Sequence, residues 1–599
     1  MKKQLIIFLV MLFFYQGNSF AKDYKGAEYR TKESYIYGRF EARYKPPKGD
    51  GIISSFFTYH EITSTNEWNE IDFEILGRYD HDVLVTSIAP GQKWRNSHQY
   101  VHFNTHDDFH NYAFEWTPDY IAWFIDGNEV YRQTQQHIAE FRYSQKIMMN
   151  LWISNWEPWV GHFDERVLPL FAYYDWISYA SYTPGTGNTG TDHNFTFQWK
   201  DELDYWDQNR WDKATHSFGG NLVDFTPENI VFKDGVMILC LTKPSPLGYL
   251  DQSAPAVLWN RALQNTVQVG FSETLEPSSA QQKSNYLISG LTISEAKILA
   301  DQRTVELTVS DLNPQNSYSL IVLGIKDNSP AQNMMVGQNV QLNIAQPLTF
   351  PVKINVGGNA YGDYLADQIW SPELEYGHQD GYSYTWPGSI DIIGTEDDAV
   401  YLSELQEVVE YKIRVPNGLY KITLMIAENR FFESGKRIFD IFIEGNKVVS
   451  DLDLVQEVGS YTACQVVADN VEIKDEMIDI HLTNLWNYSL LNGIIVEQID
   501  TGIDDDRSES IPHQFQLSQN YPNPFNSVTT INYQLPEDCH VMLKVFNAMG
   551  QEVITLVNKK QKAGYYSIHW NVRQAASGLY FYWIKANEFS KVCKTILLR

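Results

Sequence analysis

The segment EWNEIDFEILG at residues 67–77 alternates acidic and apolar side chains at strict intervals. Glu70, Asp72 and Glu74 occupy every second position, so on a β-strand all three carboxyl groups would share one face. The residues between them are Ile71, Phe73 and Ile75. The pattern therefore predicts a strand with one face in a hydrophobic core and three acids on the other.

The composition limits the classes of protein that this chain can belong to. With 599 residues it is too long for one core and should form several domains. A net charge of −28 argues against nucleic acid or an anionic membrane as a partner. The 17 Trp and 37 Tyr suit sugar binding, although β-sandwich cores use the same residues. The four cysteines are far apart and form no metal-binding spacing.

The N-terminus reads as a secretory signal peptide at residues 1–21. Lys2 and Lys3 precede an apolar run at residues 5–15 that is too short to span a bilayer, and Ala21 is a small residue at a plausible cleavage point. No later stretch reaches membrane-spanning length. We expect a secreted protein without a membrane span.

Short alternating segments separated by turn residues predict an all-β, multidomain fold. YGRFEARYKP and MMNLWIS alternate, and YIAWFIDGNEVY predicts a hairpin around Asp126 and Gly127. TPGTGNTGTD at residues 183–192 is typical of a Gly/Thr linker, and the alternating pattern of β-strands resumes after it.

The acidic stripe has three interpretations. A solvated strand face and a calcium site are two of them, but natural sheet edges favour mixed charge, and calcium usually takes loop ligands. Retaining glycoside hydrolysis fits better, because it needs two carboxyl groups about 5–5.5 Å apart. Crowding three carboxyl groups also favours retention of a proton near neutral pH, which a general acid requires.

WNEIDFEILG resembles the E-x-D-x-E signature of glycoside hydrolase family 16, and the flanking pieces AEYRTKESYIYGRFEARYKPP, FHNYAFEWTPDY and KIMMNLWIS agree with it. The resemblance implies a jelly-roll sandwich in which Glu70 is the nucleophile, Glu74 is the acid/base and Asp72 tunes both. Spacing alone cannot assign the two Glu roles. Laminarinases usually carry one extra residue before the last Glu, and its absence here favours the lichenase-like or xyloglucan-active branches.

The order of segments resembles a circularly permuted lichenase. FTFQWKDELDYW and NIVFKDGVMILCLTK, which open the domain in most lichenases, follow the linker here. Sandwich termini often lie close together, so a short linker can join them. We therefore expect one catalytic domain over residues 22–250, with residues 183–192 inside it.

The same resemblance implies a set of substrate-binding residues. Asp207 stands where many relatives have Asn, and Thr86 and Ile88 replace an Asn and a Tyr on the acceptor side of the cleft. Core packing is the alternative role for each aromatic. The implied residues are Glu28, Arg30, Phe57, Tyr59, Trp68, Asn150, Trp152 and Tyr205.

No cofactor is expected for catalysis. Many family members hold one structural calcium ion, and Asp175 with the carbonyl of Gly235 match that site. A plain hydrogen-bonded Asp at a strand is the alternative.

Two more β domains are expected after the catalytic one. Residues 251–347 resemble a bacterial Ig-like module in VQVGFSE and NYLISGL, for which a spacer role is expected and a binding role is the alternative. Residues 348–500 resemble a malectin-type jelly roll in INVGGNAYGDYLADQIW and GLYKITLMIAENRFFESGKRIFDIFIEG. In this domain either sugar binding or a spacer role is possible. Its candidate stacking residues are Tyr361, Tyr384, Trp386 and Phe431.

The C-terminal part begins with an acidic linker at residues 501–514. Residues 515–599 then resemble the sorting domain of type IX secretion, with NYPNPFN and ASGLYFY as its marks. The resemblance implies the type IX machinery as a partner and an extracellular or cell-surface location. Cys539 and Cys593 lie on expected strands there and either pair or stay as thiols.

Together these features predict a secreted, monomeric, retaining endo-β-glucanase that hydrolyses mixed-linkage β-1,3-1,4-glucan. The rivals on the same fold are a laminarinase, a xyloglucan-active hydrolase and a transglycosylase. A non-catalytic glucan-binding protein is the rival from another class, and the intact E-x-D-x-E argues against it.

Overall fold

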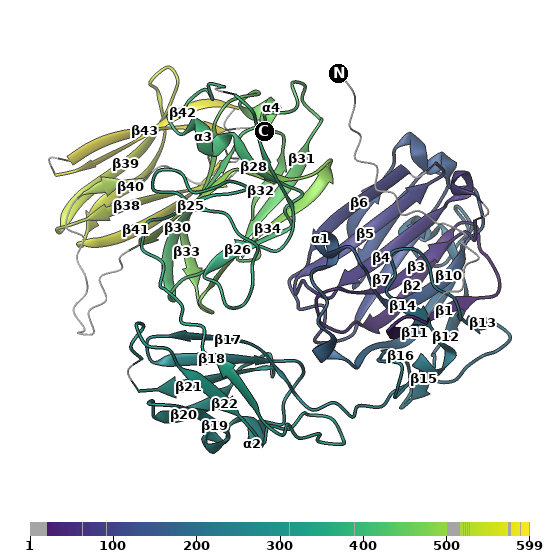
Figure 1. Ribbon diagram of the computed structural model, residues 1–599. Coiled ribbons are helices and arrows are strands. Elements are labelled where there is room, and N and C mark those ends of the chain that lie inside the picture. The colour runs from purple at the N-terminus through teal and green to yellow at the C-terminus, as the bar shows by residue number, and fades with distance from the viewer. Residues whose placement is uncertain are drawn as a thin grey trace. The chain divides into compact units, whose positions relative to one another are not determined.

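The computed structural model describes residues 21–499 and 515–597, apart from residues 63, 92, 311, 389, 519, 521–522, 524, 526–527, 573–576 and 588. The expected signal peptide, up to residue 20, and the linker at residues 501–514 lie outside the described residues. Nearly all described elements are strands, so the predicted all-β class is confirmed (Figure 1). In the described part of the chain, no helix is both long enough and apolar enough to cross a membrane.

The chain divides into two compact units, residues 1–499 and 500–599. The first unit begins with a sandwich of two sheets, here called the N-terminal sandwich. One sheet, the cleft sheet, has the order β13-β1-β10-β3-β4-β5-β6, with β14 paired to β1. Its strands are β1 (Tyr24–Thr31), β3 (Ile52–Tyr59), β4 (Glu70–Leu76), β5 (Asp82–Ala89), β6 (Lys93–Tyr100), β10 (Lys146–Ile153), β13 (Trp211–Lys213) and β14 (Val223–Phe225).

The opposite sheet of the sandwich has the order β15-β16-β11-β2-β7-β8-β9, with β12 paired to β11. Its strands are β2 (Gly38–Lys45), β7 (His110–Trp116), β8 (Ile121–Ile125), β9 (Asn128–Gln133), β11 (Leu170–Tyr182), β12 (Phe195–Asp201), β15 (Ile230–Lys233) and β16 (Val236–Leu241). The Gly/Thr segment at residues 183–192 connects β11 to β12 as a hairpin, since Tyr182 pairs with Phe195.

One hydrophobic core lies between the two sheets. It contains the inward side chains of β4 together with residues that follow the Gly/Thr segment, such as Trp211, Val223 and Leu239. These later residues are fully buried, because β13 and β14 pair with β1 and β16 pairs with β11. The strands before and after residues 183–192 therefore share one sandwich, which is the arrangement that a permuted domain requires.

The next part of the first unit, residues 256–345, packs a four-stranded sheet and a three-stranded sheet around its own core. Its strands are β17 (Val257–Leu263), β18 (Thr266–Phe271), β19 (Tyr286–Ile288), β20 (Ile293–Ile298), β21 (Thr304–Val309), β22 (Ser319–Val322) and β23 (Gln338–Gln341).

Residues 351–499 form a third sandwich, with sheets β25-β24-β36-β30-β33 and β26-β29-β34-β31-β32 and a small sheet β27-β28-β35. Its strands are β24 (Val352–Asn355), β25 (Leu365–Ala366), β26 (Tyr376–His378), β27 (Tyr382–Thr385), β28 (Ser403–Gln406), β29 (Glu410–Arg414), β30 (Gly418–Ile426), β31 (Ile438–Ile443), β32 (Asn446–Leu452), β33 (Cys464–Ile473), β34 (Met477–Trp486), β35 (Leu490–Leu491) and β36 (Gly493–Ile499).

The second unit is a sandwich of sheets β37-β38-β41 and β40-β39-β42-β43. Cys539 and Cys593 both carry free thiols. Its strands are β37 (Gln516–Leu517), β38 (Val528–Leu535), β39 (Cys539–Asn547), β40 (Glu552–Gln561), β41 (Gly564–Asn571), β42 (Gly578–Ala586) and β43 (Phe589–Leu597).

Helices are short and lie between strands. The α-helices of the described chain are α1 (Glu157–Val160), α2 (Pro277–Ala280), α3 (Asp398–Tyr401) and α4 (Leu454–Glu457). The 3-10 turns are η1 (Thr65–Glu67), η2 (Gln136–Glu140), η3 (Glu165–Val167), η4 (Thr191–His193), η5 (Pro227–Asn229) and η6 (Lys283–Asn285).

Candidate active site

Strand β4 carries the three acids on the open face of the cleft sheet. Ile71, Phe73 and Ile75 are buried in the core on its other face. The pairing of β4 with β3 runs without a register shift from Tyr59 opposite Glu70 to Ile53 opposite Leu76. The strand therefore has no bulge between Asp72 and Glu74, and the three carboxyl groups form one row.

Two buried contacts hold strand β4 in place, one from the core side and one at the residue before its first position. The indole N–H of Trp123 donates to the carbonyl oxygen of Asp72 at 2.9 Å, and Trp123 itself is fully buried. Asn69, also buried, accepts hydrogen bonds from the backbone N–H groups of Arg142 and Tyr143 at 3.2 and 3.1 Å. The row of acids is thus mounted on a rigid part of the fold.

Each Glu of the row receives one neutral hydrogen-bond donor. Trp68 donates its indole N–H to Glu70 at 2.5 Å, and Thr86 on β5 donates its hydroxyl to Glu74 at 3.1 Å. In addition, the side chains of Glu70 and Asp72 are hydrogen-bonded to each other. No cation forms an ion pair with the row among the described residues.

Burial without a paired cation raises the pKa of all three acids. The pKa of Glu70 rises to about 8 and that of Glu74 to about 7, because both carboxyl groups lose hydration. The pKa of Asp72 rises further, because the two Glu charges add to its own burial. Hydrogen bonds from Trp68 and Thr86 oppose the rise by stabilising the ionised Glu forms. The row consequently holds protons at neutral pH, which move among the three groups.

Six of the eight expected substrate residues lie on strands beside the row and on its face of the sheet. Tyr59 and Phe57 on β3 pair with Glu70 and Asp72, and cross-strand partners share a face. The register continues through β10 to β1, where Glu28 pairs with Asn150. The six residues are Glu28, Arg30, Phe57, Tyr59, Asn150 and Trp152. Trp68, the seventh, contacts Glu70 directly.

The residues on β1, β3 and β10 form one wall of the cleft, and an ion-pair network links them. The sequence did not predict this network. Glu28 is buried and pairs with Arg30 at 2.7 Å. Arg30 in turn pairs with Glu61 at 2.9 Å, and Lys146 reaches the same Glu61 at 2.9 Å. Glu61 and Lys146 could have been suspected only from their places just after β3 and at the start of β10.

The wall on the other side of the row comes from β5 and β6. Ile88, Thr86 and Leu84 pair with Glu70, Asp72 and Glu74. The next residues in register, on β6, are Trp94, Asn96 and His98. Trp94 is 46% exposed and meets Trp68 edge to face at 5.6 Å between ring centroids. The sequence analysis missed Trp94, although its place on an alternating strand that follows the acidic one was a usable signal.

Tyr205 is the expected cleft residue that the structure leaves apart. It lies in the loop between β12 and β13 and is 64% exposed. Among the residues that the structure describes, it makes no hydrogen bond or ring contact with the cleft. Asp207, two residues on, pairs with Arg210 at 3.9 Å and accepts from the backbone N–H of Asn209. The assignment of Tyr205 to the cleft stays a prediction.

The expected calcium ligands do not form a free donor set. The carboxylate of Asp175 pairs with Arg43 at 2.6 Å, and a cation there would compete with the guanidinium. Gly235 lies in the turn between β15 and β16, with a left-handed φ of 82°. A different acidic group, Asp251, Glu273 and Asp327, brings ligand oxygens within 4.8 Å of one another. The residues present therefore do not fit the expected site well.

The candidate sugar-stacking residues of the third sandwich are partly exposed. Tyr361 and Tyr384 are 47% and 44% exposed, and Tyr384 meets Trp386 edge to face at 5.0 Å. Phe431 lies under the guanidinium of Arg437 at 5.3 Å. Of the four rings, Tyr361 and Tyr384 are the exposed ones, while Trp386 packs against a hydrophobic cluster and Arg437 with its ion-pair partner Glu428 is buried.

With the acidic row and its walls described, comparison with known proteins decides the family. The family model for glycosyl hydrolases family 16 matches residues 14–165. A beta-glucanase of Fibrobacter succinogenes is 40% identical over 232 residues, covering 38% of this chain and 66% of the relative. A solved Bacillus licheniformis beta-glucanase is 36% identical, covering 25% of this chain and 70% of that chain, with a TM-score of 0.24. The chain belongs to glycosyl hydrolases family 16.

Outside the family 16 region the chain differs from these relatives. A beta-glucanase of Acetivibrio thermocellus is 42% identical over 160 residues, which cover 26% of this chain and 46% of the relative. The chain thus spans about two thirds of the Fibrobacter relative and less than half of the Acetivibrio one. A malectin domain matches residues 351–502, and a secretion system C-terminal sorting domain matches residues 519–598. The predictions of a family 16 domain, a malectin domain and a sorting domain are confirmed.

Proposed function

We propose that this family 16 chain is a retaining endo-β-glucanase that hydrolyses mixed-linkage β-1,3-1,4-glucan. The single observation that carries the proposal is the unbroken row of Glu70, Asp72 and Glu74 on the open face of the cleft sheet. The relatives named as beta-glucanases support the substrate class.

In the proposed reaction, Glu70 attacks the anomeric carbon and Glu74 protonates the oxygen of the leaving sugar. The glycosidic bond breaks as the bond to Glu70 forms, giving a glycosyl-enzyme and a free reducing end. Glu74, now ionised, removes a proton from water, which attacks the same carbon and releases Glu70. Two displacements at one carbon retain the configuration of the sugar.

The pKa values, about 8 for Glu70 and about 7 for Glu74, leave the proton of this pair on Glu70, so the reaction requires that proton to move within the row. The competent state needs Glu70 ionised while Glu74 carries a proton. Trp68 and Asp72 both hydrogen-bond to Glu70, and these bonds stabilise its ionised form against the rise in pKa that burial causes. Glu74, with a pKa of about 7, can give up and regain its proton near neutral pH.

The regular strand favours a mixed-linkage substrate over laminarin. Laminarinases of the family usually place a bulge before the last Glu, whereas β4 pairs without a register shift over its whole length. Xyloglucan hydrolysis and transglycosylation remain the alternatives on the same fold. A protein that only binds glucan would have no use for a buried row with raised pKa values.

The two later domains support a secreted, modular enzyme. We propose that the malectin domain binds sugar through Tyr361, Tyr384, Trp386 and Phe431, and that the sorting domain addresses the chain to the type IX machinery for export to the cell surface or beyond.

Reducing-sugar release from barley β-glucan, laminarin and xyloglucan tests the proposal. We expect rapid release from barley β-glucan and oligosaccharide products from early in the reaction, with little release from the other two. Faster release from laminarin would identify the chain as a laminarinase, and faster release from xyloglucan would identify it as a xyloglucan-active hydrolase. Transfer of glycosyl units in place of hydrolysis would make the chain a transglycosylase, and binding without release would make it a glucan-binding protein.

A further inference from the structure

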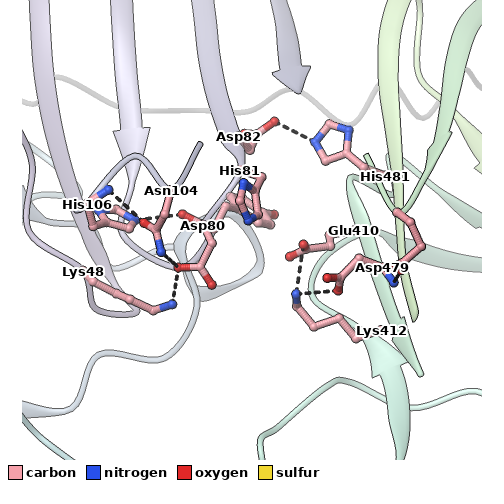
Figure 2. Close-up of polar contacts among 12 residues, drawn as sticks. Lys48, Asp80, His81, Asp82, Asn104, His106, Glu410, Lys412, Asp479 and His481 are labelled. Carbon is pink, nitrogen blue, oxygen red and sulfur yellow. Dashed lines mark hydrogen bonds and ion pairs between the residues drawn. The ribbon is translucent and has the colours of Figure 1, made fainter. Parts of the chain in front are cut away.

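The malectin domain is packed against the outer edge of the cleft sheet. Strand β6 is the edge strand of that sheet. His481 of the malectin strand β34 reaches Asp82 at 3.0 Å (Figure 2). The same carboxylate holds His98 of β6 at 2.7 Å. Asp82, His98 and His481 are all buried, at 2%, 8% and 4% exposure.

Aromatic and charged groups extend this contact along β6. Tyr100 stacks on Phe442 at 4.9 Å, and Arg95 lies over the ring of Trp486 at 4.9 Å. Further along, Lys412 is held between Glu410 and Asp479 at 3.0 and 2.9 Å (Figure 2). Burial lowers the pKa of Lys412, but the carboxylates of Asp479 and Glu410 and, across the contact, Asp80 outweigh burial and raise it.

An apolar contact reaches inward to the cleft itself. Val409 of the malectin domain is 1% exposed and packs in one cluster with Tyr79 and Leu84. Trp152, one of the candidate substrate residues, packs against the same cluster. Nearby, Arg78 donates to the carbonyl of Gln379. The malectin domain thus contributes buried side chains beside the cleft.

The position of the contact relative to the acids follows from strand register. Glu74 pairs with Leu84 on β5, and Leu84 pairs with His98 on β6. On β6 the exposed residues in register with the row are Trp94 and Asn96, so a glucan chain that crosses the strands leaves the sheet over these two residues, next to the buried His98. On the malectin side, the carboxylate of Asp380 accepts from the backbone N–H of Val409 at 2.9 Å, and the neighbouring Gln379 carbonyl accepts from Arg78 of the N-terminal sandwich, so this turn lies at the domain contact.

From Glu407 an exposed aromatic row runs across the malectin domain. Glu407 directly follows Gln406, which pairs with Tyr382 on the neighbouring strand β27. Tyr382 and Tyr384 share one face of β27 and are 38% and 44% exposed, and Trp386 follows at the same spacing. The row begins two residues after Asp380, which lies at the domain contact.

Resting on the proposed glucanase function, we propose that Tyr382 and Tyr384 of the malectin domain form a distal acceptor subsite, on which glucose units of a β-glucan stack after they pass Trp94 and Asn96. The ligand is the reducing-end part of the polysaccharide that is being cut. The flat apolar faces of glucose suit half-exposed tyrosine rings, and the docked domain makes these rings continuous with the cleft.

The test compares a long acceptor with a short one on the full chain. Barley β-glucan extends far beyond the cleaved bond, whereas the 4-methylumbelliferyl glycoside of a mixed-linkage trisaccharide has only its aglycone there. The double change Tyr382→Ala and Tyr384→Ala should lower the ratio of the two kcat/KM values, polymer over glycoside, about tenfold. Phe197→Ala removes a ring that is 51% exposed on β12 of the opposite sheet and should keep the wild-type ratio. An unchanged ratio in the folded double variant would overturn the proposal.

A second variant tests whether docking is needed. Phe442→Asp places a charge against Tyr100 at the domain contact, at a half-buried position on the malectin surface. With folding checked by circular dichroism, it should lower the same ratio to a similar extent. A wild-type ratio would show that the rings act apart from the cleft, and a raised ratio would show that the domain obstructs it. Either result overturns the proposal.

A binding measurement separates this proposal from the proposed function. In the Glu70→Gln background, retardation in gels that contain β-glucan reports affinity without turnover. Adding the two tyrosine changes should weaken the retardation, and equal retardation counts against the subsite. If the wild-type chain cleaves neither substrate, the glucanase assignment fails, while the gel result still decides whether the tyrosines bind the polymer.

Discussion

The hydroxyl of Thr86 donates a 3.1 Å hydrogen bond to Glu74 from the neighbouring strand β5. This bond stabilises the ionised form of Glu74 and so lowers its pKa against the rise caused by burial. A change at Thr86 can therefore alter the pKa of the acid/base Glu74 without altering its carboxyl group.

Replacing Thr86 by Val should shift the basic limb of the pH profile of kcat/KM upward. Loss of the donor disfavours ionisation of Glu74, so the group keeps its proton to a pH higher by roughly half to one unit. The pH profile on barley β-glucan measures the shift, and Thr86→Ser, which keeps the hydroxyl, should retain the wild-type limb. A limb that stays in place or moves downward would contradict the assignment of Glu74.

Glu70→Gln should lower kcat by at least about 10³-fold without changing the midpoint of thermal unfolding by more than a few degrees. The amide keeps the size of the side chain but cannot act as a nucleophile. The control is Glu41→Gln, a half-buried acid on β2 of the opposite sheet, which should keep full activity. Wild-type turnover by a folded Glu70→Gln chain would rule out Glu70 as nucleophile.

Glu74→Ala should lose turnover of the polysaccharide and recover product formation on an activated aryl glycoside when azide is added. An aryl leaving group departs without an acid, and the small anion then attacks the glycosyl-enzyme on Glu70 in place of activated water. The product should be a β-glycosyl azide, identified by mass spectrometry and NMR. If a folded variant forms the intermediate but yields no azide adduct, Glu74 is not the acid/base.

Glu74→Gln should stabilise the fold more at pH 8 than at pH 5. The folded-state pKa of Glu74, about 7, lies above its ordinary value of 4.5, so between these values the folded chain binds more protons than the unfolded one. Stability from this group is therefore full below pH 4.5 and falls as the pH rises toward 7, by as much as about 3 kcal/mol. Urea unfolding at both pH values measures the difference, and equal effects of the substitution at both would contradict it.

Residues 22–250 should fold and cleave β-glucan on their own, whereas residues 22–182 should not fold. The shorter fragment lacks β12–β16 and with them the buried Trp211, Val223 and Leu239. Losing these strands removes more than the ~5–15 kcal/mol by which domains are stable. Circular dichroism, thermal unfolding and reducing-sugar assays compare the two, and an active 22–182 fragment would refute the permuted arrangement.

The acidic row and the substrate residues on β1, β3 and β10 were predictable. The row follows from the two-residue periodicity of a strand, and the substrate residues follow from motifs that match the family. A two-residue period places Glu70, Asp72 and Glu74 on one face whatever the rest of the chain does. Likewise, Asp126 and Gly127 predicted a hairpin, and both adopt the left-handed φ values, 47° and 81°, that such a turn requires.

The remaining features depend on contacts between residues far apart in the sequence. Asp175 resembles a calcium ligand by residue type, but the shift in register between β11 and β2 beside it brings Arg43 onto its carboxylate. The pairing of Asp82 with His481 joins residues of two domains, and no pattern in either segment signals it. Trp94 lies on β6, two strands from the acidic strand β4, and the observed strand order places it beside Trp68.

The place of β1 in the cleft sheet also bears on biosynthesis. This strand leaves the ribosome before the other strands of its sheet, yet its partners β13 and β14 lie about 180 residues later in the chain. Until those residues emerge, one edge of the nascent sheet and the apolar side chains beneath it have no cover. Hydrolytic competence should therefore appear late and abruptly during synthesis or translocation, and a chaperone that binds exposed strand edges would find its target in the first 180 residues.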